Sequence, residues 1–409
     1  METLTAAIQF GSSHISAAVA QIDKKGRHTV MAVESVPSAG CIRHGWVVNA
    51  DEAAVHIKNL VRKLTNRIKE HGNVNLSSAY VGICGISMHS MEYCPSALLG
   101  NELFVPEKTI QQMEDQSRHL SIPGYDIIDL YNNGEEVSGQ QVIGHHQLIL
   151  AKSRLRQGIQ SVMEKAGLKI AGWHVLPLVQ NDILTEDERS GGTLLVDIGA
   201  QLTTMSIWKE GKLRFLTVIP LGGNAVTRDI ASKGLRVEEA ENQKITWSDA
   251  SRPADKNTAS PSSIPPKELN VIVAARYEEI IANIAHQLEQ SGYKGQLPGG
   301  CVLTGGCSVQ KGLHDLFEKR LEISPISTRS CSTLCYNSSD NDPSMSSLMT
   351  MLDHCTDSCF EEEKTVQPSN VETDKSNETG KKEKKGTMLF KGAARTIFDD
   401  LFHVSGDEN

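Results

Sequence analysis

Apolar and polar residues alternate in three strand-length runs over residues 4–36, and residues 192–220 repeat the pattern of an apolar strand, a tight glycine turn and a second strand. Each stretch predicts three strands, with a tight turn after the first strand at Gly11 in one copy and Gly199 in the other. A duplicated hairpin of this kind predicts an α/β chain with two related lobes that face each other. Backbone N–H groups in glycine turns bind anions and allow close approach, so the two turns can close on the phosphates of one nucleotide.

The residues between the two hairpins have a rhythm of their own. Apolar residues recur at three- and four-residue steps from Asp51 to about Gly72, which predicts a helix with Asp51 as its cap. A small α+β module is predicted to follow, inserted before the second hairpin. Its elements are a strand at 78–87, a helix at 101–120 entered at Pro106, strands at 125–131 and 142–151, and a helix at 154–166 ended by Gly167.

A second set of helices follows the second hairpin. One begins near Ala225, and residues 247–266 are rich in Ser, Pro, Asp and Ala, which indicates a loop. Residues 266–291 then repeat apolar positions along one side and predict a long amphipathic helix. A buried strand at 301–304 runs into Gly305-Gly306.

The last part of the chain differs in composition. Residues 361–386 hold no aromatic residue, which predicts a disordered linker. A basic stretch then leads into a predicted amphipathic helix at 387–404. Its apolar side holds Phe390, Ala394, Ile397, Phe398, Leu401 and Phe402, and its polar side holds Lys391 and Arg395. This pattern favours a helix lying in a membrane interface, attracted by anionic head groups. The alternative is a helix that docks on the body or in a partner's groove.

Charge and cysteine content narrow the function classes. The net charge of −9 argues against nucleic acid as a partner. No apolar run is long enough to cross a membrane, and the N-terminus lacks the order of a signal peptide, so we expect a cytoplasmic protein. Nine cysteines in such a chain indicate free thiols. Cys331/Cys335 and Cys355/Cys359 lack the usual metal-binding spacing, and we interpret them as reduced thiols.

Four sequence stretches, together with the duplicated hairpin and the insert, resemble the FtsA family of bacterial cell-division proteins, which has the actin-like ATPase fold. They are Pro37–Gly45, Leu184–Arg189, Val218–Ala231 and Leu303–Gly306, and the similarity covers about residues 4–360. The resemblance implies the following division of the chain: 1–79 and 169–190 in the first lobe (1A), 80–168 as the inserted subdomain (1C), 191–226 and 298–335 in the second lobe (2A), 227–297 as its outer subdomain (2B), 336–360 as a return helix, 361–386 as linker and 387–404 as membrane-targeting helix.

The resemblance also implies an ATP site, with its residues carried over position by position. Gly11, Ser12 and Ser13 would form the first phosphate loop, and Asp197 and Gly199 belong to the second. Asp197 would hold Mg²⁺ through water. The other residues are expected near the nucleotide cleft, the ribose and adenine, or in the adenosine loop: Gly222, Gly223, Glu241, Lys244, Gly305 and Gly306.

Several positions depart from the family pattern. Gln9 stands where the first loop usually carries an acid, and an amide is a poorer ligand for Mg²⁺. The second loop continues Ala200-Gln201-Leu202 where glycines and a hydroxyl are usual. Leu176 precedes Pro177, where hydrolytic relatives place a water-activating glutamate, so no general base is evident. Three alternatives follow: weak ATP and Mg²⁺ binding with slow or no hydrolysis, a scaffold that binds nothing, or an ATPase using other residues.

The resemblance implies a cytoplasmic protein that forms head-to-tail filaments. It would lie on the inner membrane at the division site, held to anionic lipids by Phe390, Lys391, Arg395, Ile397, Phe398, Leu401 and Phe402. It would tether the tubulin-like protein FtsZ by binding its C-terminal peptide at about 227–297. Many weak helices on one filament would bind the membrane together. The alternatives are an actin-like adaptor for pilus or secretion assembly, a nucleotide-independent scaffold of the same family, and a small-molecule kinase, for which no candidate base is visible.

Overall fold

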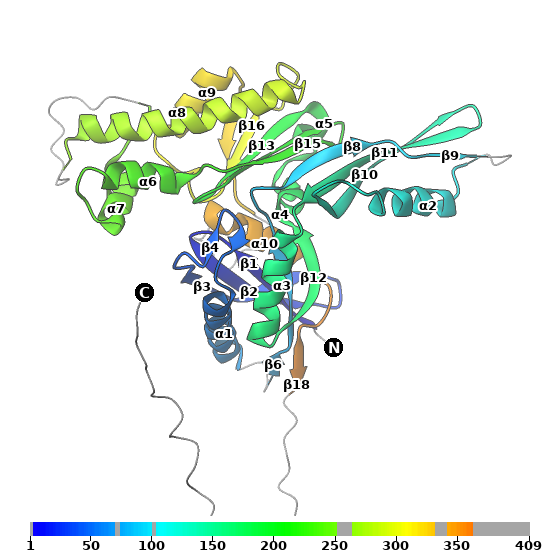
Figure 1. Cartoon of the computed structure of the whole chain (residues 1–409), viewed down its shortest axis with the longest axis horizontal. Coiled ribbons are helices and arrows are strands. Elements are labelled where there is room, and N and C mark those ends of the chain that lie inside the picture. Colours follow the sequence, from blue (N-terminus) through cyan, green and yellow to red (C-terminus); the bar gives the residue numbers. More distant parts are fainter. Residues whose placement is uncertain (1–2, 70–73, 100–103, 252–263, 332–341, 363–409) are drawn as a thin grey trace, which may run out of the picture. The chain divides into compact units, whose positions relative to one another are not determined.

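The computed structural model describes residues 3–69, 74–99, 104–251, 264–331 and 342–362. The N-terminal sheet has the strand order β12-β7-β1-β2-β3 (Figure 1). An antiparallel meander of β1 (Thr3–Phe10), β2 (His14–Ile22) and β3 (His28–Pro37) forms one side of this sheet. Two parallel strands, β7 (Ser78–Ile83) and β12 (Lys169–Val175), complete it. This sheet is the core of the first lobe.

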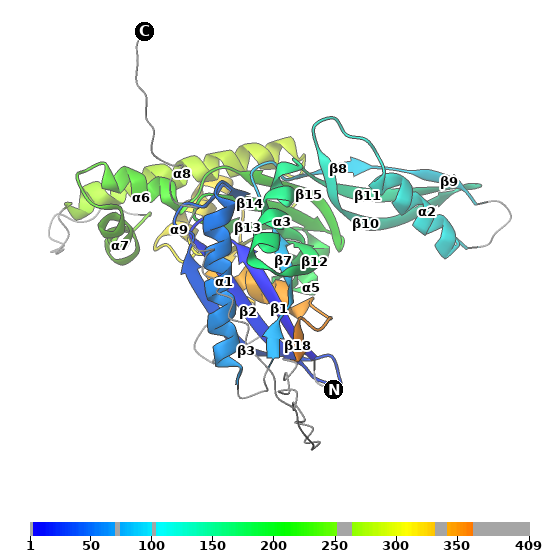
Figure 2. The same cartoon turned by 60° about the horizontal axis from the view of Figure 1, so that its bottom comes forward.

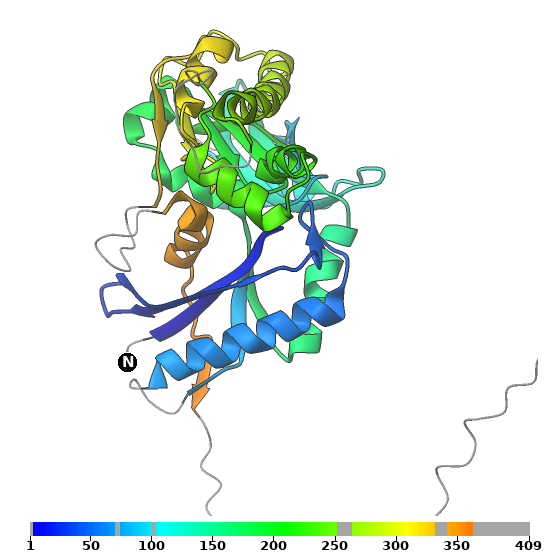
Figure 3. The same ribbon diagram turned by 90° about the vertical axis from the view of Figure 1, so that its left-hand side faces the viewer.

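Helices cover both faces of the first sheet (Figure 3). On one face α1 (Ala50–Arg67) packs beside α3 (Arg154–Ala166), and on the other lies α10 (Ser346–Asp353). Strand β2 explains why both faces need covering: Ala17, Ala18 and Val19 are all buried, so neither side of the strand is polar. A strand buried on both faces reads as a continuous apolar run rather than an alternating one.

The second lobe repeats the meander. It consists of β13 (Thr193–Ile198), β14 (Thr203–Lys209) and β15 (Lys212–Ile219), extended by β16 (Cys301–Thr304) and β17 (Ile326–Thr328). Its helices are α6 (Gly223–Ala231), α7 (Val237–Trp247), α8 (Pro266–Gln290) and α9 (Leu313–Leu321). The apolar side of α8 is buried in a core shared with β13, β14 and α9.

The insert joins the edge of the second sheet rather than the first (Figure 2). Its strands are β8 (His89–Tyr93), β9 (Ser96–Leu98), β10 (Asp126–Ser138) and β11 (Gln141–Ala151), and α2 (Glu107–Arg118) packs on β10 and β11. His89 pairs with Thr217 of β15, and the backbone N–H of Leu216 donates to Ser90 Oγ at 2.9 Å. Tyr131 meets Trp208 edge to face, with ring centroids 5.3 Å apart.

Short elements connect the lobes. The chain leaves β12 through α4 (Leu176–Val179), a 3-10 turn η2 (Gln180–Ile183) and α5 (Glu186–Gly191). It returns through η3 (Pro343–Met345) into α10, and β18 (Phe360–Glu362) then pairs with β6 (Val74–Leu76). The small ribbon of β4 (Ile42–Arg43) and β5 (Trp46–Val47) follows β3.

The two predicted hairpins are confirmed, and α3 runs from Arg154 to Ala166, as predicted. Gly167 ends α3 with a φ of 78°, a left-handed conformation that glycine adopts without strain. Helix α1 differs, because its cap is Asn49 rather than Asp51: the Asn49 side chain accepts a hydrogen bond from the backbone N–H of Glu52.

Other predicted bounds change more. The 101–120 helix begins at Glu107, with Pro106 as its N-cap residue, and the 125–131 strand continues to Ser138. Strands β8, β9 and β12 and helix α9 were not predicted, and α7 was expected only through the resemblance, which implies a helix at Glu241 and Lys244. The predicted strand at 78–87 ends at Ile83, within the first sheet.

The insert, the return helix and the tail are three segments whose bounds were predicted. Strands β8–β11 of the insert cover residues 89–151, whereas β7 and α3 pack with the first lobe. The predicted bounds of the insert were 80–168. The return helix is α10, shorter than 336–360. The linker beyond Glu362 and the helix at 387–404 lie outside the described residues, as do residues 252–263 of the predicted loop.

Candidate nucleotide-binding cleft

A cavity of about 400 Å³ lies between the two lobes. The turn after β1, the turn between β13 and β14 and the loop after β16 all line it, together with residues of α4, α7 and η3. Ten of the eleven predicted nucleotide residues are among its lining: Gly11, Ser12, Ser13, Asp197, Gly199, Gly223, Glu241, Lys244, Gly305 and Gly306. The fold therefore brings segments that are far apart in the chain to one site.

Gly222, the eleventh residue, does not line the cavity. A Cβ at Gly222 would stand 2.4 Å from the carbonyl oxygen of Gly199. Directly beyond it, the N–H groups of Gly223 and Asn224 donate to the carbonyls of Gly199 and Ala200 at 3.0 and 2.7 Å. Gly222 thus holds the start of α6 against the second turn, and its role in the structure is close backbone packing.

The first turn is held by Ser38. The Ser38 hydroxyl donates to the Ser12 carbonyl at 2.7 Å, and its backbone N–H donates to the Ser13 carbonyl at 2.8 Å. At Gly11 a Cβ would lie 2.5 Å from the carbonyl oxygen of His14, so only glycine fits there without a shift. Ser38, which belongs to the stretch Pro37–Gly45, therefore fixes the conformation of this turn.

Asp197 is satisfied by two side chains of the chain itself. Gln180 Nε2 donates to Asp197 Oδ2 at 2.6 Å, and Ser347 Oγ donates to the same oxygen at 3.1 Å. Gln180 also donates to Ser347 Oγ at 2.6 Å. Burial raises the pKa of the Asp197 carboxyl, and these two donors lower it again in part. One oxygen of the predicted magnesium residue is thus already occupied by neutral donors.

The sequence did not predict Gln180 or Ser347 as site residues. Gln180 follows Leu176 by one helical turn, so its position after Leu176-Pro177 was a usable signal. Ser347 enters from α10, 150 residues after Asp197, and no local pattern points to it.

A second missed contact crosses the cleft beside the phosphate turns. The backbone N–H of His44 donates to Gln201 Oε1 at 3.0 Å, and His44 Nδ1 lies 3.1 Å from the Gln201 carbonyl oxygen. His44 has a φ of 49°, which is unusual for a residue with a side chain. Gln201, in the second loop, thus links the second lobe to the β4–β5 ribbon of the first, and we call this contact the His44–Gln201 latch.

The other end of the cavity is built around a buried lysine. Lys244 Nζ donates to Glu241 Oε2 at 2.7 Å, to Thr227 Oγ1 at 3.0 Å and to the Gly223 carbonyl at 3.4 Å. Only 5% of the Lys244 side chain is exposed, so its charge needs these partners. Helix α7 therefore presents a neutralised Lys–Glu pair to the cavity, joined to the start of α6.

The loop after β16 closes this end. Gly305 has a φ of 84°, and a Cβ there would lie 2.1 Å from Asp197 Oδ1. Gly306 and Cys307 line the cavity beside Tyr277. The Tyr277 hydroxyl is buried without an oxygen or nitrogen partner among the described residues. The Tyr277 hydroxyl instead bonds the side chain of Cys307.

The departures in the sequence all lie at the phosphate end. Gln9, Leu202, Leu176 and Pro177 line the cavity. Among its described lining residues, the acids are Asp197, held by Gln180 and Ser347, and Glu241, held by Lys244. Both carboxylates therefore accept hydrogen bonds from neighbouring side chains.

The buried cysteines lie away from the cleft chemistry. Cys355 and Cys359 are free and buried, and Cys359 Sγ lies 3.7 Å from Thr5 Oγ1. Burial raises the pKa of the Cys355 thiol. Cys335 lies outside the described residues, so the interpretation of the Cys331/Cys335 pair stays a prediction.

Comparison with known proteins identifies relatives of the chain. Residues 194–377 match the family model "Cell division protein FtsA". A cell division protein FtsA of Porphyromonas gingivalis is 31% identical over 353 residues, which cover 80% of this chain and 73% of that protein.

Solved structures share the fold at low sequence identity. A PilM–PilN type IV pilus biogenesis complex aligns with a TM-score of 0.64 and 17% identity, covering 85% of this chain and 97% of the other. MreB5 of Spiroplasma citri bound to ADP aligns with a TM-score of 0.51 and 12% identity, covering 85% and 95%. These likenesses establish the actin-like fold of the described residues.

Proposed function

This chain belongs to the FtsA family of cell-division proteins, and from that premise we propose an actin-like division protein that binds ATP in its interlobe cleft and hydrolyses it slowly or not at all. The observation that carries the proposal is the pairing of Asp197 with Gln180 and Ser347 inside a cavity that keeps its adenosine end. The cleft can hold a nucleotide, and its acid is already occupied.

The size and lining of the cavity support nucleotide binding. A volume of about 400 Å³ falls within the usual range for small-molecule sites. The backbone turns at Gly11–Ser13 and Gly199–Leu202 flank it on two sides, as anion-binding turns do. A fold neighbour, MreB5, carries ADP. Mg²⁺ would have to bind through water at Asp197, because Gln9 offers only an amide.

Weak hydrolysis follows from the same residues. A general base must accept a proton from the attacking water within hydrogen-bond reach. Leu176 offers no such group, and one oxygen of Asp197 accepts two hydrogen bonds already. That oxygen is therefore not available to accept a proton from water or to bind a hydrated metal ion.

The first experiment is equilibrium binding of a fluorescent ATP analogue to the purified chain, with and without Mg²⁺. We expect saturable binding that Glu241→Ala weakens, because that change releases Lys244 at the adenosine end. Glu210→Ala, an exposed acid in the β14–β15 turn, is the matched control and leaves binding unchanged. Absence of binding at millimolar nucleotide would contradict the proposal and favour the nucleotide-independent scaffold.

We extend the proposal to a partner surface on the outer part of the second lobe, about 227–297. Helix α7 exposes Val237 and Trp247, and exposed apolar side chains of this kind fit a short peptide with apolar anchors. We propose that the C-terminal peptide of FtsZ binds there. Val237→Asp with Trp247→Ala should weaken peptide binding at least tenfold in a fluorescence-anisotropy titration. Val55→Asp, an equally exposed valine on α1, is the control.

Membrane attachment is the last part of the proposal. No described helix is long and apolar enough to cross a bilayer. We propose that residues 387–404 lie in the interface of the inner membrane, on its cytoplasmic face at the division site. Filaments of the chain would multiply this weak contact. Phe398→Asp with Phe402→Asp should abolish sedimentation with anionic vesicles, whereas unchanged sedimentation would refute the membrane helix.

The fold likeness to a PilM–PilN complex keeps one alternative in view, an actin-like adaptor for pilus assembly. That protein shares the fold at 17% identity. The two functions differ in their expected partners. Binding of the FtsZ peptide together with vesicle binding favours the division protein, and loss of both in the full chain favours the adaptor.

A further inference from the structure

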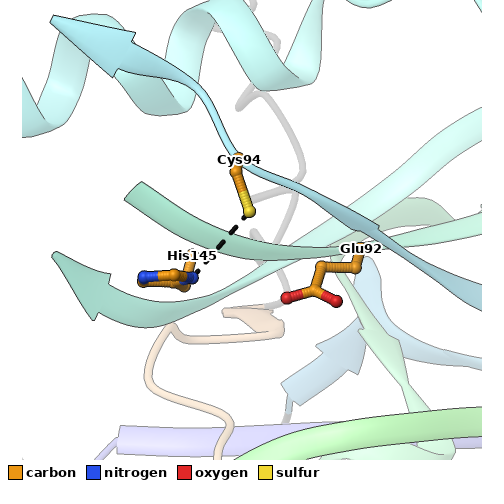
Figure 4. Close-up of side chains that lie close together, drawn as sticks. All are labelled: Glu92, Cys94 and His145. Atoms are coloured by element: carbon orange, nitrogen blue, oxygen red, sulfur yellow. Dashed lines mark hydrogen bonds between the residues drawn. The ribbon is translucent and has the colours of Figure 1, made fainter. Parts of the chain in front are cut away.

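The insert carries a cluster of metal-ligating side chains that are not part of the lining of the nucleotide cleft (Figure 4). Glu92 and Cys94 lie at the end of β8, and His145 lies on β11. One ligand atom from each lies within 4.8 Å of the other two. We propose that Glu92, Cys94 and His145 bind a Zn²⁺ ion at the surface of the insert. This inference does not depend on the proposed nucleotide or division function.

The strand register explains why these three side chains meet. Tyr93 pairs with His146 in the antiparallel β8–β11 ladder, so Cys94 lies opposite His145 one step further along. Glu92 and Cys94 are two residues apart and therefore project from the same face of their strand. The intervening Tyr93 packs in the small core beside Leu148, and His146 bonds Ser117 of α2 at 2.7 Å. The opposite face is thus left to Glu92, Cys94 and His145.

The distances suit a tetrahedral zinc ion. Cys94 Sγ lies 3.8 Å from His145 Nδ1. Two such ligands on one zinc, at about 2.3 Å for sulfur and about 2.0 Å for nitrogen, stand roughly 3.5 Å apart. Figure 4 shows the thiol and the imidazole turned toward each other, with the Glu92 carboxylate extending toward them from β8. Small rotamer changes therefore bring all three atoms to bonding distance.

The second nitrogen of His145 supplies an independent argument. His145 Nε2 lies 3.5 Å from Glu136 Oε2 of β10. A metal-binding histidine usually donates its other ring N–H to a carboxylate, which fixes the tautomer and turns the free nitrogen to the metal. Here Glu136 lies on the Nε2 side of the ring, and Nδ1 lies on the side of Cys94. Glu136 is therefore a positioning residue, and Glu92, Cys94 and His145 are the ligands.

The chemical softness of the three ligands determines which metal ion this site prefers. A thiolate and an imidazole with one carboxylate favour Zn²⁺ over Mg²⁺ or Ca²⁺, which prefer oxygen ligands. Binding replaces the thiol proton by zinc and releases that proton to solvent. Three protein ligands leave a fourth position for water. Cys94 is exposed, so the ion can enter and leave directly.

The test is stoichiometric titration of the reduced full chain with Zn²⁺ alone, in competition with a chromophoric chelator. Co²⁺ substitution adds a thiolate-to-cobalt absorption band as a direct report on sulfur. We expect one Zn²⁺ per chain, and at least a hundredfold weaker binding together with loss of the band in Cys94→Ser and His145→Gln. Glu136→Gln should weaken binding about tenfold while keeping the band, as expected for an outer carboxylate.

Two control variants guard against other thiols and histidines. His119→Gln changes an exposed histidine of the same insert, whose Nδ1 contacts a backbone carbonyl. Cys335→Ser removes a cysteine outside the described residues. Both should bind Zn²⁺ as the parent does, and circular dichroism should show all variants folded. Absence of a thiolate band in the folded parent chain, or equal binding by Cys94→Ser, would overturn the proposal.

Discussion

The two ends of the interlobe cleft differ in how their polar side chains are paired. At the adenosine end, Lys244 and Glu241 neutralise each other and the Gly305-Gly306 loop leaves open space. At the phosphate end, side chains of the protein bond one another across the space: Gln180 and Ser347 to Asp197, and Gln201 to His44. At both ends the polar side chains named are thus paired within the chain, and we propose that this pairing leaves room for a nucleoside but weakens phosphate and metal binding.

The largest expected effect lies where the two ends touch, at Gly305. Gly305→Ala forces a left-handed backbone on alanine and places its Cβ against Asp197 Oδ1. We expect the free energy of unfolding to fall by about 3 kcal/mol, from backbone strain plus the steric clash. Urea unfolding measures it. Gly292→Ala is the matched control, because Gly292 has a φ of 76° and open space around it, and it should lose about 1 kcal/mol. Equal losses would mean that Asp197 does not contact the loop.

The next effect concerns the donors on Asp197. Gln180→Ala leaves a buried carboxylate with Ser347 as its remaining described partner. Hydrogen bonds to charged groups are the stronger kind, so unfolding should become easier by about 2 kcal/mol. Thermal denaturation and denaturant titration both report it. Gln160→Ala removes an exposed helix-surface bond to Glu164 and should stay within about 0.5 kcal/mol of the parent.

Breaking the His44–Gln201 latch should lower the free energy of unfolding by less, but it should change hydrogen exchange and ligand binding at the cleft. Gln201→Gly removes the contact between its side-chain Oε1 and the His44 backbone N–H and keeps the backbone carbonyl contact, at a cost of about 1 kcal/mol. Amide hydrogen exchange should speed up in residues 42–47, and the ATP analogue should bind more tightly because the phosphate turn regains space. His44→Gly tolerates the positive φ and should produce the same two changes. If the double variant shows the sum of the two single effects, the residues do not act as a pair.

The smallest effect is a pH dependence at Asp197. Burial raises its pKa above the unfolded value of 3.8, so the folded state holds the proton more readily than the unfolded state does. The charged carboxylate therefore lowers stability at neutral pH, and this deficit disappears as the pH falls through the raised pKa toward 3.8. Asp197→Asn should be more stable than the parent at pH 7, and the gap should narrow at pH 4. A gap that is constant with pH would contradict the raised pKa.

Local patterns predicted much of the fold. The repeated pattern of apolar strands and glycine turns predicted the two meanders, and the glycine after residues 154–166 marked the end of α3. Local patterns did not predict helix α7, because its apolar residues Val237, Ile245 and Trp247 are exposed and form no buried stripe. Strand β8 escaped because it is short and ends just before Pro95.

The same distinction between local signals and contacts distant in sequence applies to the residues of the site. Glycine turns and strand ends are local signals, so residues such as Gly11 and Gly305 could be predicted to lie at one cavity, although nucleotide binding by them stays a prediction. Gln180, Ser347 and His44 act through partners that are distant in sequence and carry no motif. Sequence therefore marked the positions that depart from the family pattern, and only the structure showed which side chains contact one another there.

The way the insert is connected gives it a mechanical meaning. The chain leaves the first sheet after Ile83, joins the edge of the second sheet at His89, and comes back to the first lobe at Arg154. At this crossing the backbone N–H of Lys152 donates to Ser87 Oγ, so the outgoing and returning strands are fastened together. Rotation of one lobe against the other would displace this crossing together with the other connections between the lobes, α4–α5 and η3. Because the insert is hydrogen-bonded to the second sheet, it would move with that lobe.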